Sequence, residues 1–202
     1  MRLLSDLLGT LSSTFRFNRA TLSAAGLTAA RVYTLPDLAG TLDLKPLRAA
    51  LAAVFTGAAS NTTNQTVLTL NVPANTLVAG KMYRVSLFGT QSQSAAANTV
   101  TARLQVGATA MVAVAVAAGN VAQTNRALYF NADLMFPVVG ATGSMVAGGE
   151  LAISGVLPLG NATVTPSAIN TTAIVTITVT LANSLSDAAN ICRAVTCEIT
   201  EI

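Results

Sequence analysis

Hydrophobic and polar residues alternate along much of the chain beyond residue 65. Residues 100–106 read Val-Thr-Ala-Arg-Leu-Gln-Val, and the same two-residue period recurs over 128–136 and 175–181. A period of two places successive side chains on opposite faces of a strand, which leaves one face apolar and the other polar. With the turn signals between them, eight segments predict strands: 66–72, 82–89, 99–106, 110–117, 126–136, 144–154, 171–181 and 191–199.

These strands predict an all-β protein. Eight antiparallel strands with one polar face each are typical of an antiparallel β-sandwich, and a jelly roll is the common eight-strand form of two packed sheets. The best-defined hairpin spans 99–117, where Gly107-Ala108-Thr109 joins two alternating segments and the short loop sets the register. The order of the remaining strands does not follow from the pattern.

The first 57 residues differ and predict a small N-terminal extension of short helices and strands. Five leucines recur at helical spacing and give residues 1–12 an apolar stripe. A helix of this length is marginal alone, so we expect it to dock on its own domain, a sister subunit or a host surface. Short extended segments are predicted at 14–18 and 30–35, with a turn at Pro36-Asp37.

A second helix is predicted over 46–55. Pro46 is acceptable in a first helical turn, and Gly57 follows the segment and ends it. The positions that define one apolar face are Leu47, Leu51 and Val54.

Residues 58–65 are small and polar and predict a linker or an exposed loop. The sequence therefore divides into an attachment and oligomerisation region at 1–57 and a jelly-roll domain at 58–202.

The composition is 52% hydrophobic and only 9% charged, where soluble domains carry roughly 25% charged residues. So few charges favour burial between subunits over a monomeric surface. No apolar run reaches the roughly 20 residues that a membrane-spanning helix needs. The N-terminus resembles a weak signal peptide until Asp6 interrupts it, so we expect it to be retained.

Histidine is absent, which removes the usual general base, nucleophile activator and metal ligand. Ser/His/Asp and Cys/His catalysis are therefore excluded. The eight acids form no paired motif, so a carboxylate hydrolase stays open only if two acids converge in space. Tryptophan is absent and aromatics that would stack on sugar rings are scarce. We expect no enzymatic activity, no cofactor and no metal.

The basic and sulfur-containing residues also limit the possible functions. The arginines are scattered without a basic block, so nucleic-acid binding is not predicted. Cys192 and Cys197 lie five apart in one predicted strand, a separation of roughly 16 Å. A disulfide requires roughly 4.4–6.8 Å between Cα atoms. We expect two free, buried thiols, which fits folding in a reducing cytoplasm.

Two segments resemble parts of bacteriophage proteins. Residues 26–42 read Gly-Leu-Thr-Ala-Ala-Arg-Val-Tyr-Thr-Leu-Pro-Asp-Leu-Ala-Gly-Thr-Leu, which resembles the GLTAARTYTLPDxxGTL element of phage tail-fibre and other virion structural proteins. Residues 71–89, followed by 99–107, are similar to the jelly-roll modules of phage fibres and capsid decoration proteins. The resemblance implies a virion structural protein in which three chains wrap together, and a single copy of the element favours a collar or attachment piece.

The first hypothesis is a homotrimeric accessory protein on the virion surface, a capsid decoration or short head fibre made in the host bacterial cytoplasm. Its N-terminal region would bind the major capsid protein or another virion protein. The alternative is a receptor-binding tail-fibre or tail-tip protein that recognises a host surface ligand, placed second because Tyr33, Tyr83 and Tyr129 all fall in predicted strands. A carbohydrate-active enzyme or secreted lectin is a third class. No nucleic-acid or membrane partner is expected.

The candidate site residues are interface positions. The leucines would form an anchoring face, or pack inside their own domain, and the arginines would pair with acids of a partner shell protein. The predicted set is Leu3, Leu4, Leu7, Leu8, Leu11, Arg16, Arg19, Arg31, Tyr33, Pro36 and Asp37.

The low charge and the resemblance predict a trimer in solution. Light scattering coupled to size exclusion should give three times the mass of one chain at micromolar concentration. A stable monomer under those conditions contradicts the prediction.

Overall fold

The computed structural model describes residues 14–17, 20–23, 47–119, 121–155, 160–163 and 167–202. The chain divides into two compact units, Met1–Leu44 and Lys45–Ile202. In the first unit, β1 (Thr14–Phe17) and β2 (Ala20–Ser23) form an antiparallel pair. This confirms the extended segment predicted at 14–18 over its described residues. The helix predicted over 1–12 and the strand predicted at 30–35 lie outside the described residues.

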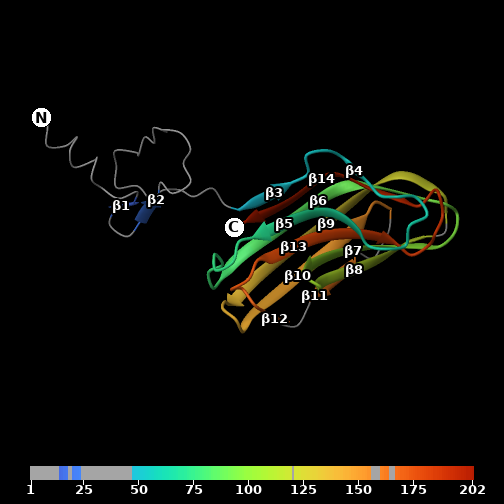
Figure 1. Ribbon diagram of the computed structural model, residues 1–202. Coiled ribbons are helices and arrows are strands. Elements are labelled where there is room, and N and C mark those ends of the chain that lie inside the picture. The colour runs from blue at the N-terminus through green and yellow to red at the C-terminus, as the bar shows by residue number, and fades with distance from the viewer. Residues whose placement is uncertain (1–13, 18–19, 24–46, 120, 156–159, 164–166) are drawn as a thin grey trace, which may run out of the picture. The chain divides into compact units, whose positions relative to one another are not determined.

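The second unit is an antiparallel sandwich of two sheets (Figure 1). Within the described residues the larger sheet has eight strands, which are, in spatial order, β11 (Gly160–Thr163), β10 (Gly143–Ile153), β9 (Gln123–Val138), β6 (Lys81–Gln93), β14 (Ile191–Glu201) and β3 (Arg48–Ala50), with β12 (Ser167–Ile169) on β10 and β4 (Phe55–Thr56) on β14. The smaller sheet has the order β5 (Gln65–Val72), β13 (Val175–Asn183), β7 (Asn98–Val106) and β8 (Thr109–Gly119). The predicted all-β sandwich is confirmed.

The strand pairing is that of a jelly roll. The paired strands are nested in the sequence. The innermost pair is β7 with β8, followed by β6 with β9, β5 with β13, and both β3 and β4 with β14. These nested pairs lie alternately in the smaller and the larger sheet, as when one long antiparallel ribbon folds over into two layers. Strand β10 is an addition that extends the larger sheet beyond β9.

The core lies between the two sheets and follows the predicted alternation. The apolar positions of 100–106, 128–136 and 175–181 are buried. Tyr83 and Phe136 meet edge to face in this core, with ring centroids 6.1 Å apart. The predicted hairpin also forms: Val106 faces Thr109 across a tight turn in which Gly107 has φ 58°, a conformation that glycine adopts without strain.

The helix predicted over 46–55 is wrong, because this segment contributes β3 and β4 to the larger sheet. Leu47, Ala49 and Leu51 are half-buried against the core while the residues between them are exposed, which is a period of two. Val54, assigned to the helical face, is 57% exposed. Pairing with β14 outweighs the local helical pattern, because intrinsic propensity is weaker than tertiary contact.

The compact unit that holds the sandwich begins at Lys45, so β3 and β4 belong to it although they precede residue 58. The predicted loop at 58–65 is confirmed over most of its length, since exposed residues connect β4 to β5. The attachment role predicted for 1–57 stays a prediction.

A β-bulge in β14 changes which residues face the core. Ala194 is opposite Gly89 and Thr196 is opposite Phe88, so Val195 is an extra residue. The insertion keeps Cys192 and Cys197 both buried although they are an odd number of residues apart, and it leaves Val195 exposed on the outer side.

Gly89 makes this bulge possible. A Cβ atom at position 89 would lie 2.9 Å from the carbonyl carbon of Arg193 and 3.1 Å from the Cα of Ala194, and closer still to the Arg193 carbonyl oxygen. Only a residue without a side chain lets β14 approach β6 so closely.

Gly89→Ala should therefore destabilise the sandwich by about 3 kcal/mol, because the added methyl group displaces backbone that has no free space to move. Urea unfolding monitored by circular dichroism measures the loss. Thr90→Ala, on the same strand, is the control and should change stability by less than about 0.5 kcal/mol. Equal stability of the two variants contradicts the packing role of Gly89.

Candidate functional site

The site residues predicted from the sequence lie in the N-terminal region. Arg16 lies in β1, where it is opposite Thr21, and its side chain is not described. The other ten lie outside the described residues: Leu3, Leu4, Leu7, Leu8, Leu11, Arg19, Arg31, Tyr33, Pro36 and Asp37. Their attachment role stays a prediction.

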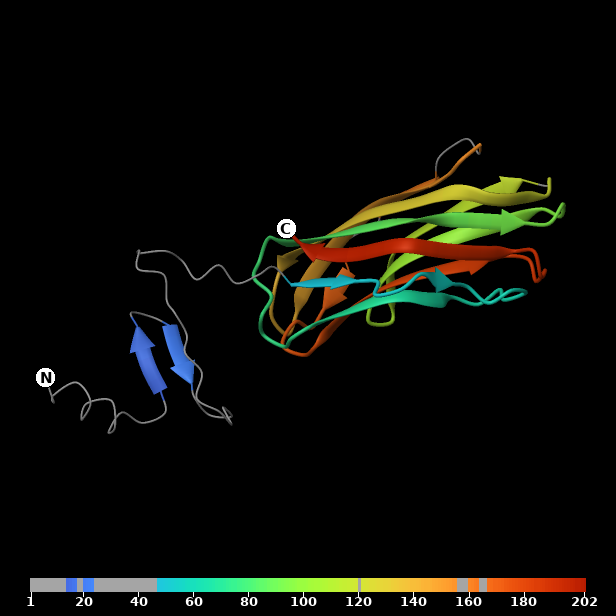
Figure 2. The same ribbon diagram turned by 90° about the horizontal axis from the view of Figure 1, so that it is seen from above.

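The richest side-chain surface in the described residues is the outer face of the larger sheet. Figure 2 shows β3, β14, β6 and β9 side by side in this sheet. The register arranges the outward residues of β14, β6, β9 and β10 in rows across the strands. From one end to the other, the rows are Met82, Met135 and Val146; Thr200, Arg84, Asp133 and Gly148; Glu198, Ser86, Asn131 and Glu150; and Thr196, Phe88, Tyr129 and Ala152. We call this set the row face.

An aromatic pair occupies one end of the row face. Phe88 on β6 and Tyr129 on β9 are direct cross-strand partners, with ring centroids 5.1 Å apart and planes at 41°. They are 38% and 46% exposed. Val195 on β14 is also exposed, because the bulge turns it outward beside Thr196, the cross-strand partner of Phe88. Large apolar side chains gathered on a surface mark an interaction site more often than scattered ones do.

The two tyrosines of the larger sheet lie on opposite faces of it. Tyr83 and Tyr129 both lie in strands, as predicted, and Tyr83 lies in the core at 1% exposure. The side chain of Tyr129 points to the outer face. Alternation places Tyr129 opposite the buried positions of its strand, and the same rule applied to 82–89 places Phe88 outward. Only the register between β6 and β9 brings the two rings together.

The charges of the row face are largely paired. Arg84 donates to both carboxylate oxygens of Asp133, at 2.9 and 3.3 Å, and the hydrogen bond raises the pKa of Arg84. Arg48 on β3 lies 2.7 Å from Glu198. The Thr200 hydroxyl donates to Glu198 and is the largest cause of the lowered pKa of that carboxyl, and Arg48 lowers it further.

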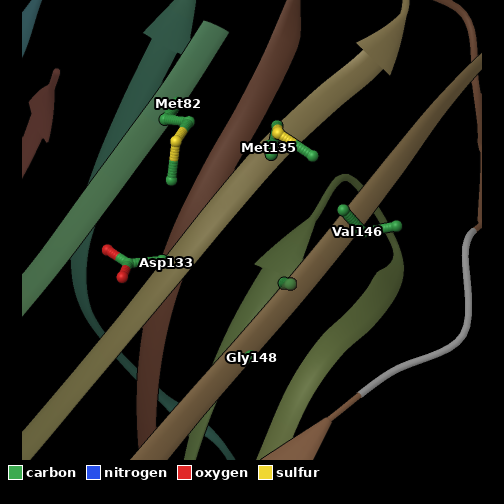
Figure 3. Close-up of a pocket in the computed structure, with 6 residues that line it drawn as sticks. Met82, Asp133, Met135, Val146 and Gly148 are labelled. Carbon is green, nitrogen blue, oxygen red and sulfur yellow. The ribbon is translucent and has the colours of Figure 1, made fainter. Parts of the chain in front are cut away.

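Two hollows lie on the row face beyond the aromatic row. One, of about 320 Å³, is lined by Met82 on β6, Asp133 and Met135 on β9, and Val146 and Gly148 with Ala147 on β10 (Figure 3). The other, of about 190 Å³, lies between β6 and β14 and is lined by Arg84, Ser86, Glu198, Thr200 and Ile202. Gly148 adds no side chain to its row, which leaves space beside Asp133.

A buried polar network stabilises the sandwich near the aromatic end. Arg126 donates from Nη2 to Gln91 at 3.0 Å, to Gln93 at 3.2 Å and to the Ala118 carbonyl at 2.6 Å. Gln93 also donates to the carbonyls of Ala118, Gly119 and Val121. Burial lowers the pKa of Arg126. The network ties the ends of β6, β8 and β9 together, so the strands that carry Phe88 and Tyr129 are held in one register.

The described residues contain neither a candidate metal site nor a candidate membrane-spanning helix. In the described part of the chain, no three Cys, Asp or Glu side chains are arranged to hold a metal ion. Among the same residues, no helix has the length and apolar character needed to cross a membrane.

The protein is therefore a jelly-roll sandwich whose larger sheet presents an exposed aromatic pair and mostly paired charges on its outer face. No protein-family model matches the chain, and no curated protein matches it. One similar solved structure is the CBM2 module of the evolved Dit protein of Lactobacillus casei BL23 phage J-1, with a TM-score of 0.37 and 7% identity over 78% of this chain and 97% of that chain. A likeness this distant carries no argument about what the chain binds.

The two cysteines take no part in the row face. Both are free and buried, as predicted. Burial raises the pKa of Cys192 and of Cys197 to about 12, an effect that a contact with Asn183 opposes at Cys192 and the charge of Glu198 reinforces at Cys197. Thiols react as thiolates, so these two are inert in the folded protein.

At mildly alkaline pH, native protein should release no colour from dithionitrobenzoate, and both thiols should react once the protein is unfolded in guanidinium. The reaction is followed by absorbance against time. Prompt reaction of either thiol in native protein contradicts the burial of β14.

Proposed function

We propose that the chain is a non-enzymatic bacteriophage virion protein whose sandwich binds a ligand on the surface of the host cell. The row face is the binding surface, and the part of the predicted attachment region that precedes the sandwich, residues 1–44, attaches the protein to the particle. This corresponds to the receptor-binding tail-fibre or tail-tip hypothesis. The phage assignment is supported by the resemblance at 26–42, and the binding role by the aromatic pair.

The observation that carries the binding role is the exposure of Phe88 and Tyr129 as direct cross-strand neighbours. Packing of the two rings contributes only about 0.2–1 kcal/mol to the sheet, and the apolar area of Phe88 and Tyr129 that stays in water is available to a partner. Aromatic residues are enriched at binding hot spots, where they supply contact area at low entropic cost. A capsid decoration or short head fibre needs only its attachment region, so it leaves this pair without a role.

One measurement separates a position on the tail from a position on the head. An antibody against the sandwich, visualised on virions by electron microscopy, labels the tail for a receptor-binding protein. A label confined to the head returns the chain to the decoration class. The predicted trimer stays a prediction whether the protein lies on the tail or on the head.

The double variant Phe88→Ala/Tyr129→Ala should lose cell binding. Fluorescently labelled protein is incubated with a panel of bacterial strains, and cell-bound fluorescence is measured against protein concentration. Removing a hot-spot aromatic costs about 2 kcal/mol, so affinity for a strain that binds the wild type should fall about 30-fold or more. The control is Ile174→Ala, which removes a side chain that is 66% exposed and lies outside the row face.

Three outcomes contradict this function. Binding of the double variant at wild-type strength rules out the row face, and absence of wild-type binding across the panel rules out host recognition. A change in solution mass caused by the double substitution assigns the aromatic pair to a contact between subunits instead.

A further inference from the structure

The row face crosses four strands, and its aromatic pair and larger hollow are arranged along the strand direction. The aromatic pair and the larger hollow both span β6 and β9, and they lie in rows at opposite ends of the row face. Three steps of two residues at about 3.4 Å per residue separate the row of Phe88 from the row of Met82, which gives a length of about 20 Å. A ligand that used both ends would lie along the strands and be extended.

The aromatic end suits the apolar face of a sugar ring. The C–H groups on one face of a pyranose carry partial positive charge, and the face of an aromatic ring is negative, so the two stack. The neighbours in the same row, Thr196 and Ala152, are small and do not rise above the rings. The next row beyond the pair contains Thr90 and Ala127, which are also small, with the exposed Arg193 beside them on β14. A glycan chain can therefore continue past the aromatic pair in both directions.

The middle of the face supplies hydrogen-bonding groups for hydroxyls. Ser86 and Asn131 are exposed cross-strand partners. Within the described residues, their side chains make no hydrogen bond to the protein. Glu150, opposite Asn131 on β10, is exposed and adds an acceptor. One hydroxyl group offers both a donor and an acceptor, which matches this mixed set.

The charge balance indicates a neutral ligand. The outward side of the sheet carries three arginines, Arg48, Arg84 and Arg193, and three acids, Asp133, Glu150 and Glu198. Two of the arginines are already bound to acids of the same face. Within the described residues, Arg193 and Glu150 make no ion pair and balance each other in charge. A surface for a phosphorylated or carboxylated polymer would instead present an excess of unpaired cations to attract it.

We propose that the ligand of the row face is a neutral polysaccharide that lies along β6 and β9. One sugar ring stacks on Phe88 and Tyr129, later units pass over Ser86 and Asn131, and the chain reaches the hollow beside Gly148. The proposal rests on the host-binding function and names its ligand class. Internal segments of the polymer are bound, since the face is open beyond the aromatic pair.

Affinity electrophoresis of the full chain in gels that contain one polymer each tests the ligand class. The neutral probes are mannan, dextran, galactan, xylan and β-glucan, and the anionic probes are hyaluronate and poly(glycerol phosphate). At least one neutral polymer should retard the wild type and Ile174→Ala equally, and should not retard Tyr129→Ala. Retardation should be the same at low and high ionic strength, because a neutral ligand gains nothing from unscreened charge.

Oligosaccharides of increasing length from the retarding polymer then test the extended pose by calorimetry. A hexasaccharide should bind at least about tenfold more tightly than a disaccharide, since it reaches contacts at both ends. Tyr129→Ala should weaken both ligands. Met135→Ala, at the hollow, should weaken only the hexasaccharide, and Val146→Ala is the second hollow variant if Met135→Ala lowers the unfolding temperature.

The outcomes separate this inference from the function on which it rests. Cell binding that depends on the aromatic pair, without retardation by any neutral polymer, overturns the neutral glycan and leaves host binding intact. Retardation by an anionic polymer alone does the same. Equal affinity for disaccharide and hexasaccharide overturns the extended pose, and absence of both cell and glycan binding overturns both proposals.

Discussion

The pairing of β6 with β9 determines both the core and the candidate site. The odd-numbered residues of β6 from Tyr83 to Leu87 and the even-numbered residues of β9 from Leu128 to Phe136 fill the core. The residues that alternate with them, from Met82 to Phe88 and from Tyr129 to Met135, belong to the row face. A slip of one residue would exchange the two sets and bury Arg84 and Asp133 among apolar side chains, at a cost that burial of charges makes prohibitive. The register that stabilises the core therefore also places Phe88 beside Tyr129.

One departure from the two-residue period completes this surface. Regular alternation along β14 would place Cys192 and Cys197 on opposite faces, and the extra residue Val195 restores both to the core. The same insertion exposes Val195 beside Thr196, the cross-strand partner of Phe88, and Gly89 provides the space for it. A core requirement and a surface feature thus depend on a single glycine, which is typical of bulges that redirect side chains near functional sites.

The strands could be predicted from the sequence because the two-residue alternation is local to each segment. It can be recognised without knowing which strand pairs with which. Tyr129 could be assigned to an outer face for that reason. Its contact with Phe88 could not, because register depends on pairing between segments distant in the chain. The helix prediction for 46–55 was wrong for a related reason. Leu47 and Leu51 fit the period of a helix and of a strand equally, and pairing with β14 decides between them. The N-terminal interface residues lie outside the described part of the chain, so the prediction for them is unchanged.

The two outer faces of the sandwich constrain how subunits can associate. The smaller sheet presents threonines, such as Thr69 and Thr178, and the alanines of β8, with Arg103 bound to Asn64. The row face instead presents aromatic rings and paired ions. A trimer that covered Phe88 and Tyr129 would remove the ligand site, so the predicted trimer and the proposed binding are compatible only if subunits meet through another surface. The low charge of the chain does not by itself require subunit burial of the row face, since uncharged threonines and alanines cover the opposite side of the same sandwich.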